Sequence, residues 1–239
     1  MTTSKLEKRL RFLTIYVIVL TALCGFLICT SFRQTHLRQT MDELTVKRMN
    51  VVDENGALRM VISNEHRQHP GRMNGQQLPV RERPAGFIFF NEAGDECGGL
   101  IYNGSDKDAG LYLSVDKFRD DQVMQLQYSE DPQKRRRKYG LQLWDYPKER
   151  TFDERMQRFK ALKQLATREE QDKAYEQMRR DSLLMQDRLF IGQTYDNEMG
   201  LFIKDQDGKP RIKIFIDKNR QPRIQVLDTD GTIIHQPSS

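Results

Sequence analysis

The stretch "DQDGKPRIKIFIDKNRQPRIQVLDTDGTII", from Asp205 to Ile234, contains one pattern three times. Asp205, Asp217 and Asp228 each begin a four-residue polar cluster, and a run rich in Ile and Val follows each cluster. Asp at the first position accepts backbone N–H bonds and closes a turn, whereas Gly at the fourth position supplies the positive φ that lets the next strand begin. The pattern therefore predicts successive β-hairpins.

Related clusters begin at Asp53, "DENGALRM", and more loosely at Asn91, "NEAGDE". Arg220 replaces Gly in the middle copy of the C-terminal pattern, so we expect that turn to be the poorest of the set. The stretches "DQDG" and "DTDG" also resemble the start of a calcium loop, which requires further oxygen ligands and a bidentate Glu near its end. Cations and isoleucines follow Asp207 and Asp230 instead, so we predict turns and no metal site.

Apolar residues alternate with polar ones through most of the chain after residue 46, a period typical of strands with one buried face. The alternating positions are Met60 and Ile62; Leu111, Leu113 and Val115; Met124, Leu126 and Tyr128; Leu141 and Leu143; Leu189 and Ile191; Ile212, Ile214 and Ile216; and Ile224 and Val226. The runs "GFIFFN" and "GGLIY" are apolar on both faces, which predicts strands in the interior of a sheet. We expect a mainly β fold, an antiparallel hairpin meander that either curls into an open barrel or forms a sandwich.

An uncharged run of 21 residues, Phe12 to Phe32, precedes this domain. As a helix it reaches about 30 Å, the thickness of the hydrocarbon core of a bilayer. We therefore predict that residues 12–32 form a transmembrane helix in the lipid bilayer, after a cytoplasmic stub of residues 1–11. Four basic residues in that stub favour a cytoplasmic N-terminus and a C-terminal domain outside. A cleaved signal peptide is the alternative, with "CTS" at Cys29–Ser31 as its best cleavage site.

Two further segments have helical periodicity. In residues 33–48, Leu37, Met41 and Leu44 form one apolar stripe, which predicts a juxtamembrane helix. That helix packs on its own domain, continues the membrane helix, or pairs with a second copy in a homo-oligomer. Residues 149–187 contain no Pro or Gly and predict two helices, broken near Ala166–Thr167, as an insert between β segments 49–148 and 188–239. Thr151 with Glu154 and Thr167 with Glu170 are candidate capping boxes.

The charge distribution argues against nucleic-acid binding. The chain has 39 basic and 34 acidic residues, and the first eleven residues contribute four of the basic and one of the acidic ones. The remaining 35 basic and 33 acidic residues leave a net charge of only +2. Nucleic-acid-binding proteins normally present a concentrated basic surface, so we expect no nucleic-acid partner.

One dense cationic run is the candidate contact site for an anionic partner in the envelope. It consists of Lys134, Arg135, Arg136, Arg137 and Lys138. The alternative is a solvated hairpin tip between two strands. No residue pattern indicates a catalytic site, a cofactor or a metal. Cys97 follows two acids, which oppose the low pKa that a nucleophilic thiol needs. His66 and His69 lie beside a proline in a polar loop, residues 65–84.

The stretches "RMNVVDENGALRMVISN", "GFIFFNEAGDECGGLIYNG", "FRDDQVMQLQYSED" and "GLQLWD" resemble a family of uncharacterised bacterial membrane-anchored proteins. The resemblance covers most of the chain after the anchor, and "FFNEAGDECGGLIY" is its most specific part. It implies a bacterial origin and an anchor followed by a β domain, but it brings no activity, ligand or catalytic residue. We expect a non-catalytic, membrane-tethered, extracytoplasmic scaffold or interaction module. The alternatives are an envelope ligand-binding or sensory domain, with loop 65–84 over a pocket, and an envelope hydrolase.

Overall fold

The computed structural model describes residues 3–31, 40–149 and 152–235, and the chain divides into two units, 1–45 and 46–239. The first unit contains helix α1, Thr3–Ser31. Within it, the span Glu7–Ile28 has a mean hydropathy of 2.2 and is long and apolar enough to cross a membrane. The hydroxyls of Thr14 and Thr21 donate to the carbonyl oxygens four residues earlier, which leaves neither hydroxyl unpaired on an apolar helix.

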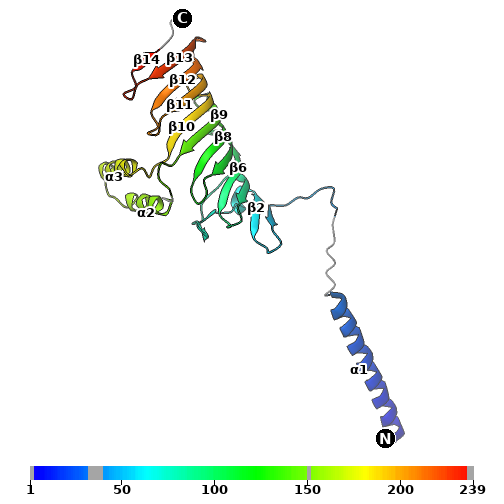
Figure 1. Ribbon diagram of the computed structural model, residues 1–239. Helices are drawn as coiled ribbons and strands as arrows, with labels where there is room; N and C mark the ends of the chain where they lie inside the picture. Colours follow the sequence, from blue (N-terminus) through cyan, green and yellow to red (C-terminus); the bar gives the residue numbers. More distant parts are fainter. Residues whose placement is uncertain (1–2, 32–39, 150–151, 236–239) are drawn as a thin grey trace. The chain divides into compact units, whose positions relative to one another are not determined.

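The second unit is one continuous antiparallel sheet of twelve strands in the order β1-β2-β5-β6-β7-β8-β9-β10-β11-β12-β13-β14 (Figure 1). Each strand pairs with its neighbours in the chain, apart from the small β3–β4 hairpin between β2 and β5. The mainly β meander predicted from the alternation is confirmed. Its pairing is that of a single open sheet with β1 and β14 at its edges, and β5 and β6 are interior strands as their apolar runs predicted. The strands are β1 Arg48–Val52, β2 Leu58–Ser63, β3 Arg72–Met73, β4 Gln76–Gln77, β5 Ala85–Phe90, β6 Glu96–Gly104, β7 Ala109–Asp116, β8 Gln122–Asp131, β9 Arg136–Asp145, β10 Gln186–Gln193, β11 Met199–Lys204, β12 Pro210–Ile216, β13 Pro222–Leu227 and β14 Ile233–His235.

Hairpin turns with a common geometry connect many of these strands. At Asp205, the backbone N–H donates to the Lys209 carbonyl and the Gly208 N–H donates to the Asp205 carbonyl. The Oδ1 atom of Asp205 accepts the N–H groups of Asp207 and Lys209. The same four hydrogen bonds form at Asp53 and Asp217. At Asp217 the fourth residue is Arg220, whose φ of 65° places an L-residue in a region that favours glycine.

The insert between β9 and β10 forms two helices, α2 Phe152–Leu162 and α3 Arg168–Arg180. Thr167 caps α3 in a capping box with Glu170, as its sequence spacing predicted. Thr151, the first residue of the other candidate box, lies outside the described residues. Leu183, Leu184 and Met178 form a buried cluster against partly buried residues of α2, so these helices pack on each other and on the segment that enters β10.

The juxtamembrane helix predicted for residues 33–48 is not found where the structure describes that segment. Residues 40–47 have no helical hydrogen bonding, and β1 begins at Arg48. Residues 33–39 lie outside the described part. Met41 and Leu44, two members of the predicted stripe, are exposed, so no packing offsets the cost of starting a helix. A helix of so few turns is marginal without such packing.

Candidate functional site

Alternate residues of the sheet form an apolar face that runs across its strands in register. The first row begins at Met49 and continues through Ile62, Phe87, Leu100, Leu113, Leu126, Leu141, Ile191, Leu201, Ile214 and Ile224, one residue from each strand of the sheet except β14. All eleven side chains in this row are apolar. The pairing register therefore places apolar residues from separate runs of the sequence side by side on one surface.

Two further rows flank the first over the seven strands β7–β13. One contains Val115, Met124, Leu143, Leu189, Ile203, Ile212 and Val226, and the other contains Leu111, Tyr128, Tyr139, Gln193, Met199, Ile216 and Pro222. We use "apolar face" for these 21 positions, seven in each of three rows. Gln193 is the one position that is neither aliphatic nor aromatic, and no position is charged.

The apolar face is exposed, not buried. Eleven of its large side chains have 36–52% of their surface open to solvent, among them Leu126, Ile214 and Ile224. A second layer over the sheet would have reduced those values to a few per cent. The alternation was expected to mark a buried face, and that expectation is wrong for this single chain. The described residues instead place their buried apolar side chains, such as Val61, Ile88 and Phe190, on the opposite face.

Part of the opposite face is covered by residues 65–84, which were predicted as a polar loop. This segment contains the short helix η1, Glu65–Arg67, and the β3–β4 hairpin. His69 contacts the ring of Phe90 edge-on at 4.9 Å, and Phe90 belongs to the buried cluster with Val61 and Ile88. Burial, followed by the charge of Arg48, lowers the pKa of His69. The imidazole is therefore neutral at pH 7, and its Nδ1 accepts the backbone N–H of Gly71 at 3.0 Å.

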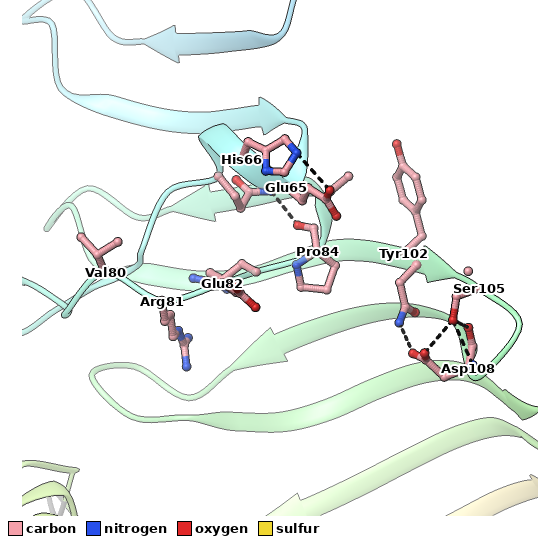
Figure 2. A pocket seen from close by; sticks show the side chains of 14 residues that line it. Glu65, His66, Val80, Arg81, Glu82, Pro84, Tyr102, Ser105 and Asp108 are labelled. Carbon is pink, nitrogen blue, oxygen red and sulfur yellow. Dashed lines mark hydrogen bonds and ion pairs between the residues drawn. The ribbon is translucent and has the colours of Figure 1, made fainter.

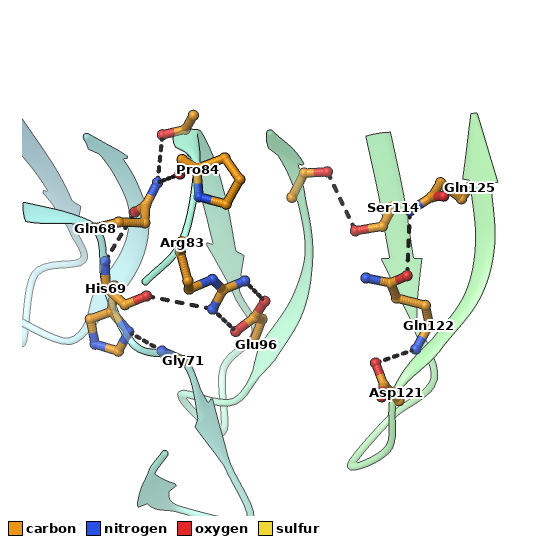
Figure 3. Close-up of polar contacts among 12 residues, drawn as sticks. Gln68, His69, Gly71, Arg83, Pro84, Glu96, Ser114, Asp121, Gln122 and Gln125 are labelled. Carbon is orange, nitrogen blue, oxygen red and sulfur yellow. Dashed lines mark hydrogen bonds and ion pairs between the residues drawn. The ribbon is translucent and has the colours of Figure 1, made fainter. Parts of the chain in front are cut away.

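Figure 3 shows how the same segment is tied to the sheet. Arg83 binds the carboxylate of Glu96 in β6 through two hydrogen bonds of 2.7 and 2.9 Å. Both side chains are only 13% exposed, which limits screening of the pair by water. The Gln68 amide donates to the carbonyl oxygens of Pro84 and Gly86. These contacts give the segment a fixed position and argue against a freely mobile loop.

A groove of about 730 Å³ lies between this segment and the β6–β7 connection (Figure 2). Its walls combine exposed apolar groups, Val80 and Tyr102, with a small polar cluster around Asp108. The Ser105 hydroxyl donates to the Asp108 carboxylate at 3.0 Å. His66 lies 3.3 Å from Glu65 and is 84% exposed. The groove thus offers a surface for a small molecule, while its polar groups hydrogen-bond mainly to one another.

The structure does not bring the five cations of residues 134–138 onto one surface. Lys134 and Arg136 both approach Asp131, at 3.5 and 3.7 Å, and Arg136 also lies over the ring of Tyr195. Lys138 lies over Phe190 at 4.5 Å on the opposite face, where burial lowers its pKa. Arg137 pairs in register with Glu130. Because side chains alternate along β9, the dense sequence run is divided between two faces.

Cys97 lies in β6 beside the glycine-rich stretch that "DECGGL" indicated. Burial, and then the carboxylate of Asp116, raise the pKa of the Cys97 thiol. The thiol therefore stays protonated at neutral pH, which makes it a poor nucleophile. Asp116 is itself perturbed, because burial and the neighbouring Glu96 raise its pKa to about 7. No sequence signal pointed to Asp116, since its environment arises from residues distant in the chain.

The sequence did not predict that the apolar face is open to solvent. The alternation was visible, but its exposure was not, because the same pattern occurs in a sheet with a covering layer. Comparisons of the chain with protein-family models, with curated proteins and with solved structures find no match. The resemblance to bacterial membrane-anchored proteins therefore stays a prediction, and inferences about function depend on the chain's own geometry.

Proposed function

We propose that this protein is a non-catalytic interaction module, tethered to a bacterial cytoplasmic membrane by α1, whose binding surface is the apolar face. The observation that carries the proposal is the row of Leu and Ile across β7–β13, uncharged and open to solvent. Soluble monomers rarely expose contiguous apolar patches larger than a few hundred Å², and larger patches mark interaction sites.

The membrane topology is part of the proposal. Lys5, Lys8, Arg9 and Arg11 precede the apolar span, so the N-terminus lies in the cytoplasm and the sheet lies outside it, in the cell envelope. Protease added to intact bacterial cells that express the full chain should remove residues 46–239. If the sheet survives in intact cells and is digested only after lysis, the proposed orientation is wrong.

Photo-cross-linking in intact membranes tests the binding surface. A photoreactive amino acid at Leu126 lies on the apolar face, and one at Gln125, the preceding residue of β8, lies on the opposite face. We expect an adduct of higher mass from position 126 and none, or a different one, from position 125. If neither position gives an adduct, or if both give the same one, the apolar face is not the binding surface.

A ligand-binding or sensory role is the second candidate, favoured by the groove of about 730 Å³ beside residues 65–84. That volume is within the range of roughly 300–1,000 Å³ typical of small-molecule sites. Native mass spectrometry of the purified full chain should then detect a co-purified small molecule. Tyr102→Arg should abolish its binding, while Leu126→Lys, on a strand that does not line the groove, should leave it unchanged.

A further inference from the structure

We infer that the partner on the apolar face is a second copy of this chain, with the two sheets packed face to face in a symmetric dimer. This inference depends on the proposed function, because it names the occupant of the same surface. A twofold interface uses one patch on both copies, so the patch must be complementary to itself. The apolar face meets that condition because its 21 positions carry no charge that would oppose its own copy.

The size of the face fits a stable dimer. Neighbouring strands are about 4.8 Å apart and alternate residues of a strand about 6.8 Å apart, so each position occupies about 33 Å². The 21 positions then cover about 690 Å², close to the roughly 800 Å² and 20–30 residues that each partner contributes to a standard interface. Obligate dimer interfaces are also more apolar than other interfaces, resembling a core divided in two.

The composition of the face fits a protein core better than a polar ligand. The central row and the flanking row that begins at Val115 contain only Leu, Ile, Val and Met over seven strands. Such residues from two inner faces interdigitate in a β-sandwich about 10 Å thick. Two copies have the same twist, so their strands align at about 30°, the angle usual for aligned sheets. The sandwich that the alternation suggested for one chain would thus form between two.

The anchor would favour this pairing. Two copies held by one membrane diffuse in two dimensions, which raises their effective concentration relative to free domains. The tether therefore adds to the affinity that the area of the apolar face already predicts for the chain outside the membrane.

The test uses the full chain, purified in detergent, with its mass determined by light scattering. We expect a dimer for the unchanged chain and a monomer for Leu126→Lys, because the symmetric interface would bury two new lysines. The dimer dissociation constant should rise on the order of 100-fold. Gln125→Lys is the matched control, with the same new charge one residue away on the opposite face, and it should remain dimeric. Ile214→Lys on β12 repeats the test if Leu126→Lys does not fold.

The alternative outcomes are distinguishable. An unchanged chain that is monomeric at micromolar concentration overturns the inference, and lipid found on that monomer by native mass spectrometry would assign the face to acyl chains. A dimer that persists in Leu126→Lys as it does in the control Gln125→Lys overturns the inference in favour of pairing through another part of the chain. A cross-link from position 126 to a different protein overturns the second-copy inference while the proposed function stands. If position 126 gives no specific adduct at all, both the second-copy inference and the proposed function are wrong.

Discussion

The two faces of this sheet are built from alternate residues of the same strands, yet they differ in polarity and in whether another part of the chain covers them. Across β7–β13, the central row of the apolar face reads Leu, Leu, Leu, Ile, Leu, Ile, Ile. The neighbouring row on the opposite face reads Ser, Gln, Gln, Phe, Phe, Lys, Gln. The more polar face is the one that residues 65–84 partly cover, whereas the more apolar face stays open.

This difference predicts that the covered face contributes mainly to folding and the apolar face mainly to association. The covered side of the unit contains the buried residues and the paired charges, so its contacts stabilise the single chain. The apolar face contains side chains that remain half-exposed in that chain, so any further burial would come from another molecule. A substitution on the covered side should lower the free energy of unfolding at every concentration, and one on the apolar face should act mainly on association.

The largest loss of stability should come from the buried ion pair between Asp120 and Arg155, which docks α2 onto the β7–β8 turn. Asp120 is 1% exposed and Arg155 is 4% exposed. In Asp120→Ala the guanidinium loses its carboxylate, and we expect a loss of about 3–5 kcal/mol in urea unfolding followed by circular dichroism. Lys173→Ala removes an exposed pair with Glu169 in the same insert and should change stability by less than about 0.5 kcal/mol. Equal effects would mean that the insert is not held by this pair.

A comparison of Ile88→Ala with Ile214→Ala tests the two faces directly. Ile88 is fully buried on the opposite face, and its truncation should cost about 2–5 kcal/mol, independently of protein concentration. Ile214 is 45% exposed on the apolar face. Its truncation should cost little at high dilution and more as concentration rises, because association stabilises the folded state by mass action. A concentration-independent loss for Ile214→Ala would contradict an intermolecular role for the apolar face.

The buried carboxyl of Asp116 should give stability a distinct pH dependence. Its pKa is raised to about 7 in the folded protein, so the folded state retains a proton that the unfolded chain releases near its ordinary pKa of 3.8. The folded state therefore binds more protons between about pH 4 and 7, and this residue lowers stability as pH rises through that window. Asp116→Asn should remove that slope and increase stability at pH 8 by on the order of 2 kcal/mol, about half of the full linkage value, because the side chain retains some solvent contact. A steeper decline in the variant would contradict the assignment.

The smallest expected effect concerns the turn that lacks glycine. Arg220 has a φ of 65°, so Arg220→Gly should relieve backbone strain and stabilise the protein by about 0.5–1 kcal/mol. Gly56 holds the same place in the Asp53 turn, with a φ of 79° and open space around it. Gly56→Ala should therefore destabilise by a similar amount through backbone strain alone. Thermal unfolding of both variants would show shifts of opposite sign, and shifts of the same sign would refute the common turn geometry.

Elements set by local interactions were accessible from the sequence. The Asp-first turns, the capping box at Thr167 and the apolar helix each depend on residues within a few positions of one another. The helix expected in residues 33–48 is absent over residues 40–47, where no packing from elsewhere in the chain supports it. The binding role expected for the cations of residues 134–138 stays a prediction, although alternation along β9 divides them between two faces.

By itself, the sequence determined where the chain reverses, where it is helical and which alternate residues share a face, because these properties arise from short-range hydrogen bonding and a two-residue period. Only the tertiary structure decided which of the two faces is covered. An alternation of apolar and polar residues shows which side chains share a face. It does not show whether that face packs against the chain's own core or faces the solvent. The pairing register of twelve strands, and the segment that folds back over the opposite face, settle that choice.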